Sequence, residues 1–430
     1  MLELGFLLIT ILSISFISIR LRNIAPLSLE AIFYIFYIVY AVLGALALLL
    51  RLDEKRLNDV VIDEGVLYFL WFISITSIIS ISLLVKLLKD RTFLDFVTIK
   101  VQGGERYDER LVLILSLFFI FITFLQFSMS DAPLAIVLSG GDVQEAFIAR
   151  QTKQDAFGFF KLYHFNFLTK EALFFWCCFL FVYFIKYKKQ GMLLTLCTLS
   201  LLVSFYSNLS KAGGVFLLAA FGILFLALKR KKLSFPVVFL GILIVVFVAV
   251  IPQYFFIPSG QEFDFFRLSK AVLSRIISGQ IEPAYYVVSY IDGNDYLYGA
   301  TFPNPKGILP FEHFDLETKT WELMNPTRLS MGLTYRNPTV FWVDGYANFG
   351  LIGIIIYVLI VAAIIYFVDV WFFRKRAINC LDAGLLCYLS FHYARLSGKS
   401  LSTFFWDLDL LVVIIFYFFS IKYLKKKEIQ

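Results

Sequence analysis

The chain of 430 residues is 60% hydrophobic and only 17% charged, with a formal net charge of +7. An average globular chain is roughly 45–50% apolar and about 25% charged, so this composition excludes a soluble enzyme, a nucleic-acid-binding protein, a disordered scaffold and a secreted disulfide scaffold. We expect the chain to be mostly embedded in a membrane. The net charge then has to be interpreted connector by connector, because Lys and Arg report sidedness.

Eleven apolar runs approach or reach the roughly 20 residues that a helix needs to cross a bilayer. In chain order they are 2–19, 27–50, 65–85, 111–129, 171–187, 191–206, 211–229, 234–252, 347–370, 378–395 and 401–423. The first run is followed at once by Arg20 and Arg22, which is the wrong polarity for a cleaved signal peptide. These runs predict an all-α polytopic membrane protein with about eleven transmembrane helices.

Basic residues are concentrated in alternate connectors between these runs. Of the 39 Lys and Arg residues, 22 lie in the short connectors of one set. Short connectors rich in Lys and Arg face the cytoplasm. The distribution predicts an N-terminus outside, a C-terminus inside and an odd number of spans.

Two connectors on the outer side are too long to be simple turns, and long loops are uncommon unless they have a function. They cover residues 129–170 and 252–346, and the second contains eight of the eleven prolines. The chain is therefore predicted to consist of N-terminal spans with the smaller loop at 1–251, a large loop at 252–346, and C-terminal spans with a basic tail at 347–430.

A helix is predicted near the start of the large loop, at residues 263–277. Its side chains separate onto a polar face and an apolar face, made of Arg267, Lys270 and Ser274 and of Phe266, Leu273 and Ile277. A helix with these two faces is suited to lie on the membrane surface. Residues 316–324 are predicted to form a second short helix.

Positive charge on the outer side runs against the topology bias, so each outer Lys or Arg needs an acidic partner or an anionic ligand. Guanidinium binds phosphate through a planar fork and stays charged at any working pH. The outer basic residues include Arg150, Lys153, Lys211, Arg267, Lys270, Arg275, Arg328, Arg336, Arg395 and Lys399. Salt bridges with acidic loop residues are the alternative interpretation for each of them.

Acidic groups form a second set of candidates. Glu312, His313 and Asp315 are clustered, and a general base near a sugar hydroxyl is a carboxylate or an imidazole. A solvated loop turn explains the cluster equally well. Asp407 and Asp409 lie near the outer end of the last span, where an uncompensated charge is costly. They are expected either to pair with the nearby Arg395 or Lys399 or to belong to a site.

No motif for a nucleotide or a metal is present. The sequence has no Walker A loop, no GxGxxG after a strand, no zincin motif and no nucleophile elbow. The three His residues are scattered, and the five Cys residues lie in or beside apolar runs. We therefore expect no cofactor, no metal and no nucleic-acid partner, and a substrate that arrives already activated, such as a lipid-linked donor.

The segment Asp344-Gly345-Tyr346-Ala347-Asn348-Phe349-Gly350-Leu351-Ile352-Gly353 resembles a signature of bacterial polysaccharide repeat-unit polymerases of the Wzy type, acid-x-Tyr-x-Asn-Phe-Gly-x-x-Gly. In that family the signature closes the large periplasmic loop and opens the next span. Weaker similarities are the turn at Ser210-Lys211-Ala212-Gly213, the pair Ala394-Arg395 before the final span, and the loop arginine Arg150. The chain departs from the family in having Lys211 for an arginine and in lacking the paired Arg-x10-Gly motifs.

The resemblance implies a GT-C-like glycosyltransferase of the bacterial inner membrane, with a periplasmic N-terminus and a cytoplasmic C-terminus. Such an enzyme transfers a growing glycan from undecaprenyl pyrophosphate onto an incoming lipid-linked repeat unit. Its partners would be the lipid-linked donor and acceptor, membrane lipid and a chain-length regulator protein. The resemblance implies Arg150, Lys211, Arg275, Arg336 and Arg395 for the pyrophosphate, and Glu312, His313 or Asp344 for the acceptor proton. The alternative interpretation is that Asp344 and Asn348 are structural residues.

Other functions stay open. An O-antigen ligase shares the scaffold and the donor but uses lipid A-core as acceptor, and the Asn-Phe-Gly segment favours the polymerase over it. A peptidoglycan glycosyltransferase is expected to carry a different signature. A lipid-linked oligosaccharide flippase or other transporter places ionisable or helix-breaking residues in the middle of several spans, and few occur here. A purely structural membrane protein is the last alternative.

Overall fold

The computed structural model describes residues 2–53, 56–57, 61–90, 107–128, 136, 139, 166–207, 212–229, 240–241, 264–304, 307–330, 335–374, 377–404 and 407–425. Within these ranges the regular secondary structure is helical, and Tyr107 and Lys425 form an isolated β-bridge. Seven of the described helices are long and apolar enough to cross a membrane. The prediction of an all-α, multi-pass membrane protein is therefore confirmed at this level.

The N-terminal half of the chain contributes the first set of described helices. They are α1 (Leu2–Leu21), α2 (Leu29–Tyr37), the π-helix η1 (Ile38–Val42), α3 (Leu43–Leu49), α4 (Glu64–Asp90), α5 (Glu109–Ser128), the π-helix η3 (Phe167–Ala172), α8 (Leu173–Tyr187), α9 (Gly191–Ser207) and α10 (Ala212–Leu228). Helices α2, η1 and α3 form one continuous apolar segment, as do η3 and α8.

The C-terminal half begins with the large loop, whose described residues include several helices. Its helices are α12 (Phe265–Ile276), α13 (Ser278–Asp292), α14 (Leu316–Met324) and α15 (Pro326–Ser330). They are followed by α16 (Phe341–Phe373), α17 (Cys380–Ala394), the short turns η5 (Arg395–Ser397) and η6 (Ser402–Phe404), and α18 (Leu408–Leu424). The two helices predicted inside the loop are both present, as α12 and α14.

The predicted spans coincide with described helices except the eighth, at 234–252, which lies outside the described residues but for a short piece. Helices α9 and α10 are apolar but shorter than the seven long ones. Helix α17 has 15 residues, and it is fully capped at its start, where Asn379 and Asp382 form a capping box. The number eleven stays a prediction, because three of these helices are short for a bilayer.

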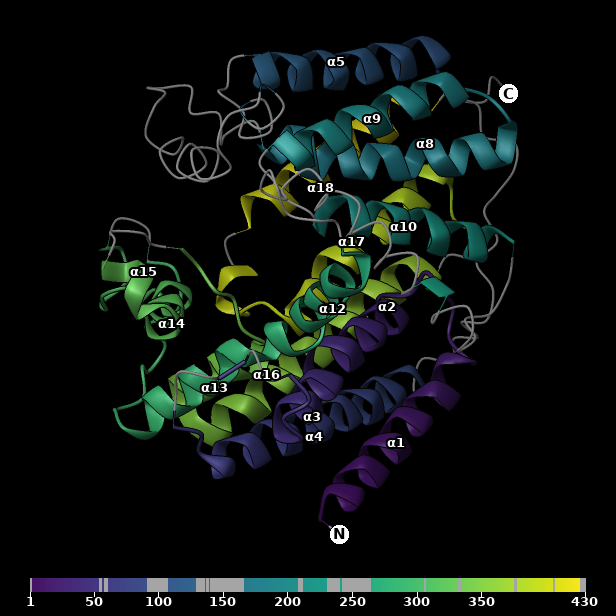
Figure 1. Ribbon diagram of the computed structural model, residues 1–430. Coiled ribbons are helices and arrows are strands. Elements are labelled where there is room, and N and C mark those ends of the chain that lie inside the picture. Colours follow the sequence, from purple (N-terminus) through teal and green to yellow (C-terminus); the bar gives the residue numbers. More distant parts are fainter. Residues whose placement is uncertain are drawn as a thin grey trace.

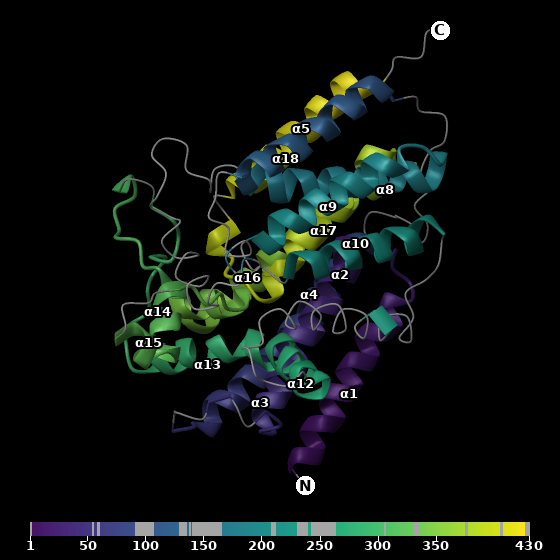
Figure 2. The same ribbon diagram turned by 45° about the horizontal axis from the view of Figure 1, so that its top comes forward.

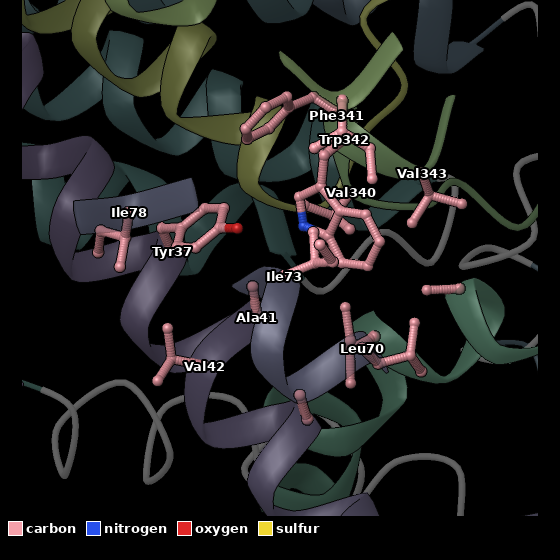
Figure 3. Packing of buried hydrophobic residues seen from close by; sticks show 14 of the residues in the cluster. Tyr37, Ala41, Val42, Leu70, Ile73, Ile78, Val340, Phe341, Trp342 and Val343 are labelled. Carbon is pink, nitrogen blue, oxygen red and sulfur yellow. The ribbon is translucent and has the colours of Figure 1, made fainter. Parts of the chain in front are cut away.

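Two groups of helices form the core. In one, α1, α2, α3, α4 and α16 pack together with α13 of the large loop, and in the other, α5, α8, α9 and α10 pack with α17 and α18. Helix α17 joins them, because it packs against both α2 and α8. Aromatic rings fill the first group, where Tyr37, Phe341 and Trp342 lie among small and branched side chains (Figure 3).

Polar contacts lie at the two ends of the helix bundle. We call the end near the C-terminus the tail end, and the end that carries α13 to α15 the loop end. At the tail end, Arg20 of α1 contacts Glu30 of α2, and Lys89 of α4 bridges Glu30 to Asp369 of α16. The start of α5 meets the end of α18 there, since the Asp108 amide donates to the Leu424 carbonyl. At the loop end, α13 to α15 gather on one side of the molecule, away from the C-terminus (Figures 1 and 2).

Helix α16 is kinked at the signature segment. Phe349 and Gly350 leave the helical conformation, and Gly350 has φ +62° and ψ −144°. A side chain is strained at such a φ, which explains a glycine here. The kink also presses Gly345 and Gly353 together, so that a Cβ added at Gly353 would clash with the Gly345 carbonyl oxygen. The glycine spacing of the signature is therefore what the bend requires.

Candidate functional site

Asp344 and Asn348 of the signature tie three segments together at the loop end. The Asp344 carboxylate is fully buried, and it accepts hydrogen bonds from Thr301 Oγ1 at 2.7 Å and from the Ser402 amide at 2.9 Å. Asn348 Nδ2 donates to Thr301 Oγ1, and Asn348 Oδ1 accepts from the Gly299 amide at 2.9 Å. These contacts fix the large loop and the α17–α18 connection to the start of α16.

A second polar group, which we call the Arg395 cluster, lies where α8, α17 and α18 meet at the loop end. It consists of Glu171, Tyr388, His392, Arg395 and Asp407. Arg395 follows the last turn of α17, and its two Nη atoms donate to the two Glu171 carboxylate oxygens at 3.1 and 3.3 Å. The side chains are only partly buried, with 28% of Arg395 and 14% of Glu171 exposed. The pair is a bidentate one, the geometry in which Arg also holds phosphate.

The Arg395 guanidinium is not fully used by this pair. Its Nε is buried and finds no hydrogen-bond acceptor in the part of the chain that the structure describes. The central carbon of the guanidinium, Cζ, lies 6.0 Å from the centre of the Phe216 ring. A buried donor without an acceptor is costly, and such groups are often found at functional sites.

His392 and Asp407 form the other half of the cluster. Nε2 of His392 lies 3.1 Å from Asp407 Oδ2, and Nδ1 lies 3.3 Å from the Tyr388 hydroxyl. Asp407 is also the N-cap of α18, where it accepts the Leu410 amide. The imidazole is almost completely buried, whereas the Asp407 carboxylate is partly exposed. Asp407 is therefore the more exposed member of this pair.

Two π-helical segments border this cluster. Glu171 belongs to η3, and Tyr40 belongs to η1. Tyr40 approaches the turn that carries Arg395, because a Cβ added at Gly398 would lie 3.6 Å from the Tyr40 ring. π-Helices are rare and occur mostly as single turns, frequently at functional sites. Their presence is an observation independent of charge that points to the same place.

Lys399 lies between the Arg395 cluster and the large loop. Its ammonium group is 5.5 Å from the centre of the Phe404 ring, and no carboxylate of the described residues is within 4 Å of it. It is near enough to lower the pKa of Glu317 in α14, although burial of that carboxylate has the larger effect and raises the pKa overall. Lys399 is thus a partly exposed cation beside the cluster.

Of the other predicted residues, Arg336 lies on the exposed surface. It pairs with Asp315 at 2.8 Å, and its side chain is 68% exposed. Partial burial raises the pKa of Asp315, but the Thr318 amide and the Arg336 guanidinium outweigh it, so that the pKa lies below its usual value. The exposed Arg336 pair is the loop salt bridge that the alternative interpretation predicted.

Glu312 and His313 lie on the exposed surface of the loop, with His313 Nδ1 3.1 Å from the Phe302 carbonyl oxygen. Arg275 is in the last turn of α12. Arg150 and Lys211 lie outside the described residues. The structure therefore brings Arg395, but neither Glu312 nor His313, into a buried polar cluster.

The partners within the Arg395 cluster differ from those expected. Asp407 contacts His392, and Arg395 contacts Glu171, although the sequence suggested a pairing of Asp407 with Arg395 or Lys399. Glu171 was missed because it is 224 residues from Arg395 along the chain. Glu30, Lys89 and Asp369 were missed for the same reason. Each is a charged residue inside or at the end of an apolar run, which was the available signal.

Among the residues that the structure describes, no group of three or more His, Cys, Asp or Glu side chains is arranged to hold a metal ion. Comparison of the chain with family models, with curated proteins and with solved structures found no match in any of the three. The similarity to repeat-unit polymerases is therefore carried by the residues of this chain alone.

Proposed function

We propose that this protein is a polysaccharide polymerase that transfers a growing glycan from undecaprenyl pyrophosphate to an incoming lipid-linked repeat unit. The observation that carries the proposal is the Arg395 cluster, in which a bidentate arginine, two carboxylates and an imidazole gather at the loop end of a multi-pass helical bundle. The Asp344–Gly353 segment, which resembles the polymerase signature, anchors the large loop beside it. The proposal places the loop end on the periplasmic side of the bacterial inner membrane.

The transfer makes one bond and breaks one bond. A hydroxyl oxygen of the acceptor's non-reducing sugar attacks the anomeric carbon of the donor glycan. The bond from that carbon to the pyrophosphate oxygen breaks, and its electron pair leaves with undecaprenyl pyrophosphate. The hydroxyl proton passes to a base on the protein. Negative charge therefore develops on the leaving pyrophosphate, and a proton has to be removed from the attacking hydroxyl.

Arg395 and Lys399 are suited to stabilise the leaving group. A preorganised cation that meets charge developing in the transition state is worth a factor of about 10²–10³ in rate when a single donor is removed. Arg395 is held in place by Glu171, and Lys399 has no direct carboxylate partner among the described residues. Of the two, Arg395 is positioned more firmly, and we assign it the larger role.

Asp407 is the base that the geometry favours. Its carboxylate is partly exposed, and it lies beside His392 in the same cluster as Arg395. Glu312 and His313 stay candidates from the sequence, and both are on the exposed loop. Asp344 is assigned a positioning role instead, because its buried carboxylate is already used by Thr301 and Ser402.

The test is deletion of the gene in its own host, followed by complementation and gel analysis of surface polysaccharide. A deletion that leaves one repeat unit and no ladder supports a polymerase. Loss of every repeat contradicts it and indicates a ligase or a flippase. Arg395→Ala and Asp407→Asn should fail to restore the ladder, whereas Arg110→Ala, at an exposed tail-end position, should restore it.

Transfer by the purified protein separates a chemical defect from a folding defect. The protein in liposomes would be given an undecaprenyl-pyrophosphate-linked repeat unit, and product length would be followed with time. Arg395→Lys keeps a positive charge but not the planar fork, so we expect a folded protein whose transfer rate is reduced by at least about tenfold. An unchanged rate in Arg395→Lys and Arg395→Ala would remove the leaving-group assignment.

A further inference from the structure

Helix α12, at the beginning of the large loop, has one face packed on the protein. Asp264 caps its start by accepting the Arg267 amide. Val272 is buried on the packed face, together with the partly buried Leu268 and Ile276, against Val215 in the first turns of α10. The helix is therefore held against the loop end of α10.

The opposite side of α12 is exposed although it is partly apolar. Phe266 is 82% exposed and Leu273 is 36% exposed, and the two residues are seven apart, so they lie on one side of the helix. The basic side chains Arg267 and Lys270 are exposed beside them. An aromatic residue next to Lys and Arg is typical of a helix that lies in the interface of a membrane.

The position of α12 indicates what covers this side. On α10, Val215, Leu218 and Phe225 recur at helical spacing, and both Leu218 and Phe225 are exposed. Exposed apolar side chains along a membrane helix face lipid. Val215, at the start of this stripe, contacts α12, so α12 lies at the end of the exposed apolar stripe of α10.

We propose that α12 is a membrane-surface helix that binds anionic phospholipid, with Phe266 and Leu273 among the upper acyl chains and with Arg267 and Lys270 on the headgroup phosphates. This proposal does not depend on the glycosyltransferase activity. Negative lipid complements the two cations, residues 265–276 of the helix include no Asp or Glu, and Asp264 before them is used as the cap. A polyprenyl chain or a second copy of the protein on this surface would be an alternative outcome.

The lipid contact would be transmitted to the large loop. Arg56, in the connector before α4, donates through Nε to Ser274 of α12 and through Nη1 to Glu282 of α13, at 3.3 and 2.6 Å. Glu282 is buried. A lipid-bound α12 therefore sets the height of α13, and with it that of the loop, above the membrane.

The five native cysteines make a direct depth measurement practical, because all of them are free and buried. The Phe266→Cys variant would be labelled with a nitroxide at its new cysteine and placed in liposomes containing phosphatidylglycerol. Ile308→Cys is the matched control, since Ile308 is 77% exposed in the large loop but not on α12. Unsubstituted protein treated with the label measures the background.

We expect the label at 266 to be more accessible to oxygen and less accessible to a water-soluble nickel complex than the label at 308. Equal nickel accessibility at the two positions would overturn the proposal. Label-to-label distances between copies that are short at 266 would overturn it in favour of a dimer. The label at 266 could also lie at the same depth in phosphatidylglycerol and phosphatidylcholine liposomes and lose that depth when polyprenyl phosphate is added. This result would overturn the proposal in favour of the substrate lipid.

The charge contribution is tested with Arg267→Gln and Lys270→Gln. Each basic residue near an anionic membrane surface is expected to strengthen binding to that membrane by about fivefold. The double variant labelled at 266 should therefore lose most of the difference in depth between phosphatidylglycerol and phosphatidylcholine liposomes. Lys86→Gln, an exposed change on α4 at the tail end, should leave that difference unchanged. A double variant that keeps the difference would refute the headgroup contact.

Discussion

The two charge clusters at the two ends of the bundle are built differently. At the tail end, two cations and two carboxylates are balanced in charge, and all of them except the partly exposed Arg20 are almost completely buried: Arg20, Glu30, Lys89 and Asp369. At the loop end, the acids Glu171, Asp407 and Asp409 outnumber Arg395 and Lys399, and the side chains are partly exposed. The tail-end group is balanced in charge, whereas the loop-end group is not.

Hydrogen bonding shows the same difference. Both Glu30 oxygens are used, by Arg20 and Tyr34 on one and by Lys89 on the other, and Asp369 accepts Lys89 and the Leu29 amide. The Arg395 Nε, in contrast, has no acceptor among the described residues. A satisfied, charge-balanced group joins four helices, and an unsatisfied one retains capacity to bind. We therefore assign structure to the tail end and chemistry to the loop end.

The largest expected effect is on stability at the tail end. Lys89→Met leaves the Asp369 carboxylate buried without its cation, and breaking a buried pair costs about 3–5 kcal/mol. Thermal unfolding of the purified protein in detergent measures the loss. Lys86→Met is the matched control, because Lys86 is exposed on the same helix. Equal losses in the two variants would show that the tail-end group is not a structural centre.

A smaller stability effect and a larger functional effect are expected at the loop end. Glu171→Gln leaves Arg395 partly hydrated, so the loss of stability should be about 1–2 kcal/mol. Transfer should fall by about 10- to 100-fold, because the guanidinium is no longer held in its position. Unfolding and liposome transfer assays on one preparation test both. The contrast would fail if Glu171→Gln were as unstable as Lys89→Met, or if its transfer rate were normal.

The smallest effects are expected on the loop surface, where two acids in one helix region have opposite pKa shifts. Burial raises the pKa of Glu317, so its ionised form costs stability at neutral pH, and Glu317→Gln should raise the melting temperature there. The Thr318 amide and Arg336 outweigh partial burial and lower the pKa of Asp315, so Asp315→Asn should lower the melting temperature. Each change should be below about 1 kcal/mol.

Acid pH should remove both differences. Below about pH 4 the Glu317 side chain becomes protonated in the folded and unfolded states alike, so the gain in Glu317→Gln disappears. The stabilisation from Asp315 is lost as the pH falls through its lowered folded-state pKa, so the defect in Asp315→Asn shrinks at more acidic pH. Melting curves between pH 3 and 8, taken as roughly spanning the pKa range of carboxyl groups, measure both. Shifts of equal sign would contradict the assignment.

The helices of this protein were largely predictable because apolar run length is a local property. The predicted runs coincide with α1 to α5, α8 to α10 and α16 to α18, and the loop helices α12 and α14 were also expected. The kink at Gly350 was not expected, although the glycines that produce it were recognised as a signature. Helix α16 also begins earlier, at Phe341, because Val340 and Phe341 are buried against other helices.

The amino-acid sequence by itself determined the membrane class, the approximate spans, the alternation of basic connectors and the interest of Arg395. These depend on composition, run length and neighbouring residues. Only the tertiary structure decided that Glu171 holds Arg395, that His392 faces Asp407, and that Asp344 is enclosed by Thr301 and Ser402. The physical reason is that ion pairs and hydrogen bonds act over a few ångströms in space, and packing brings together partners far apart along the chain.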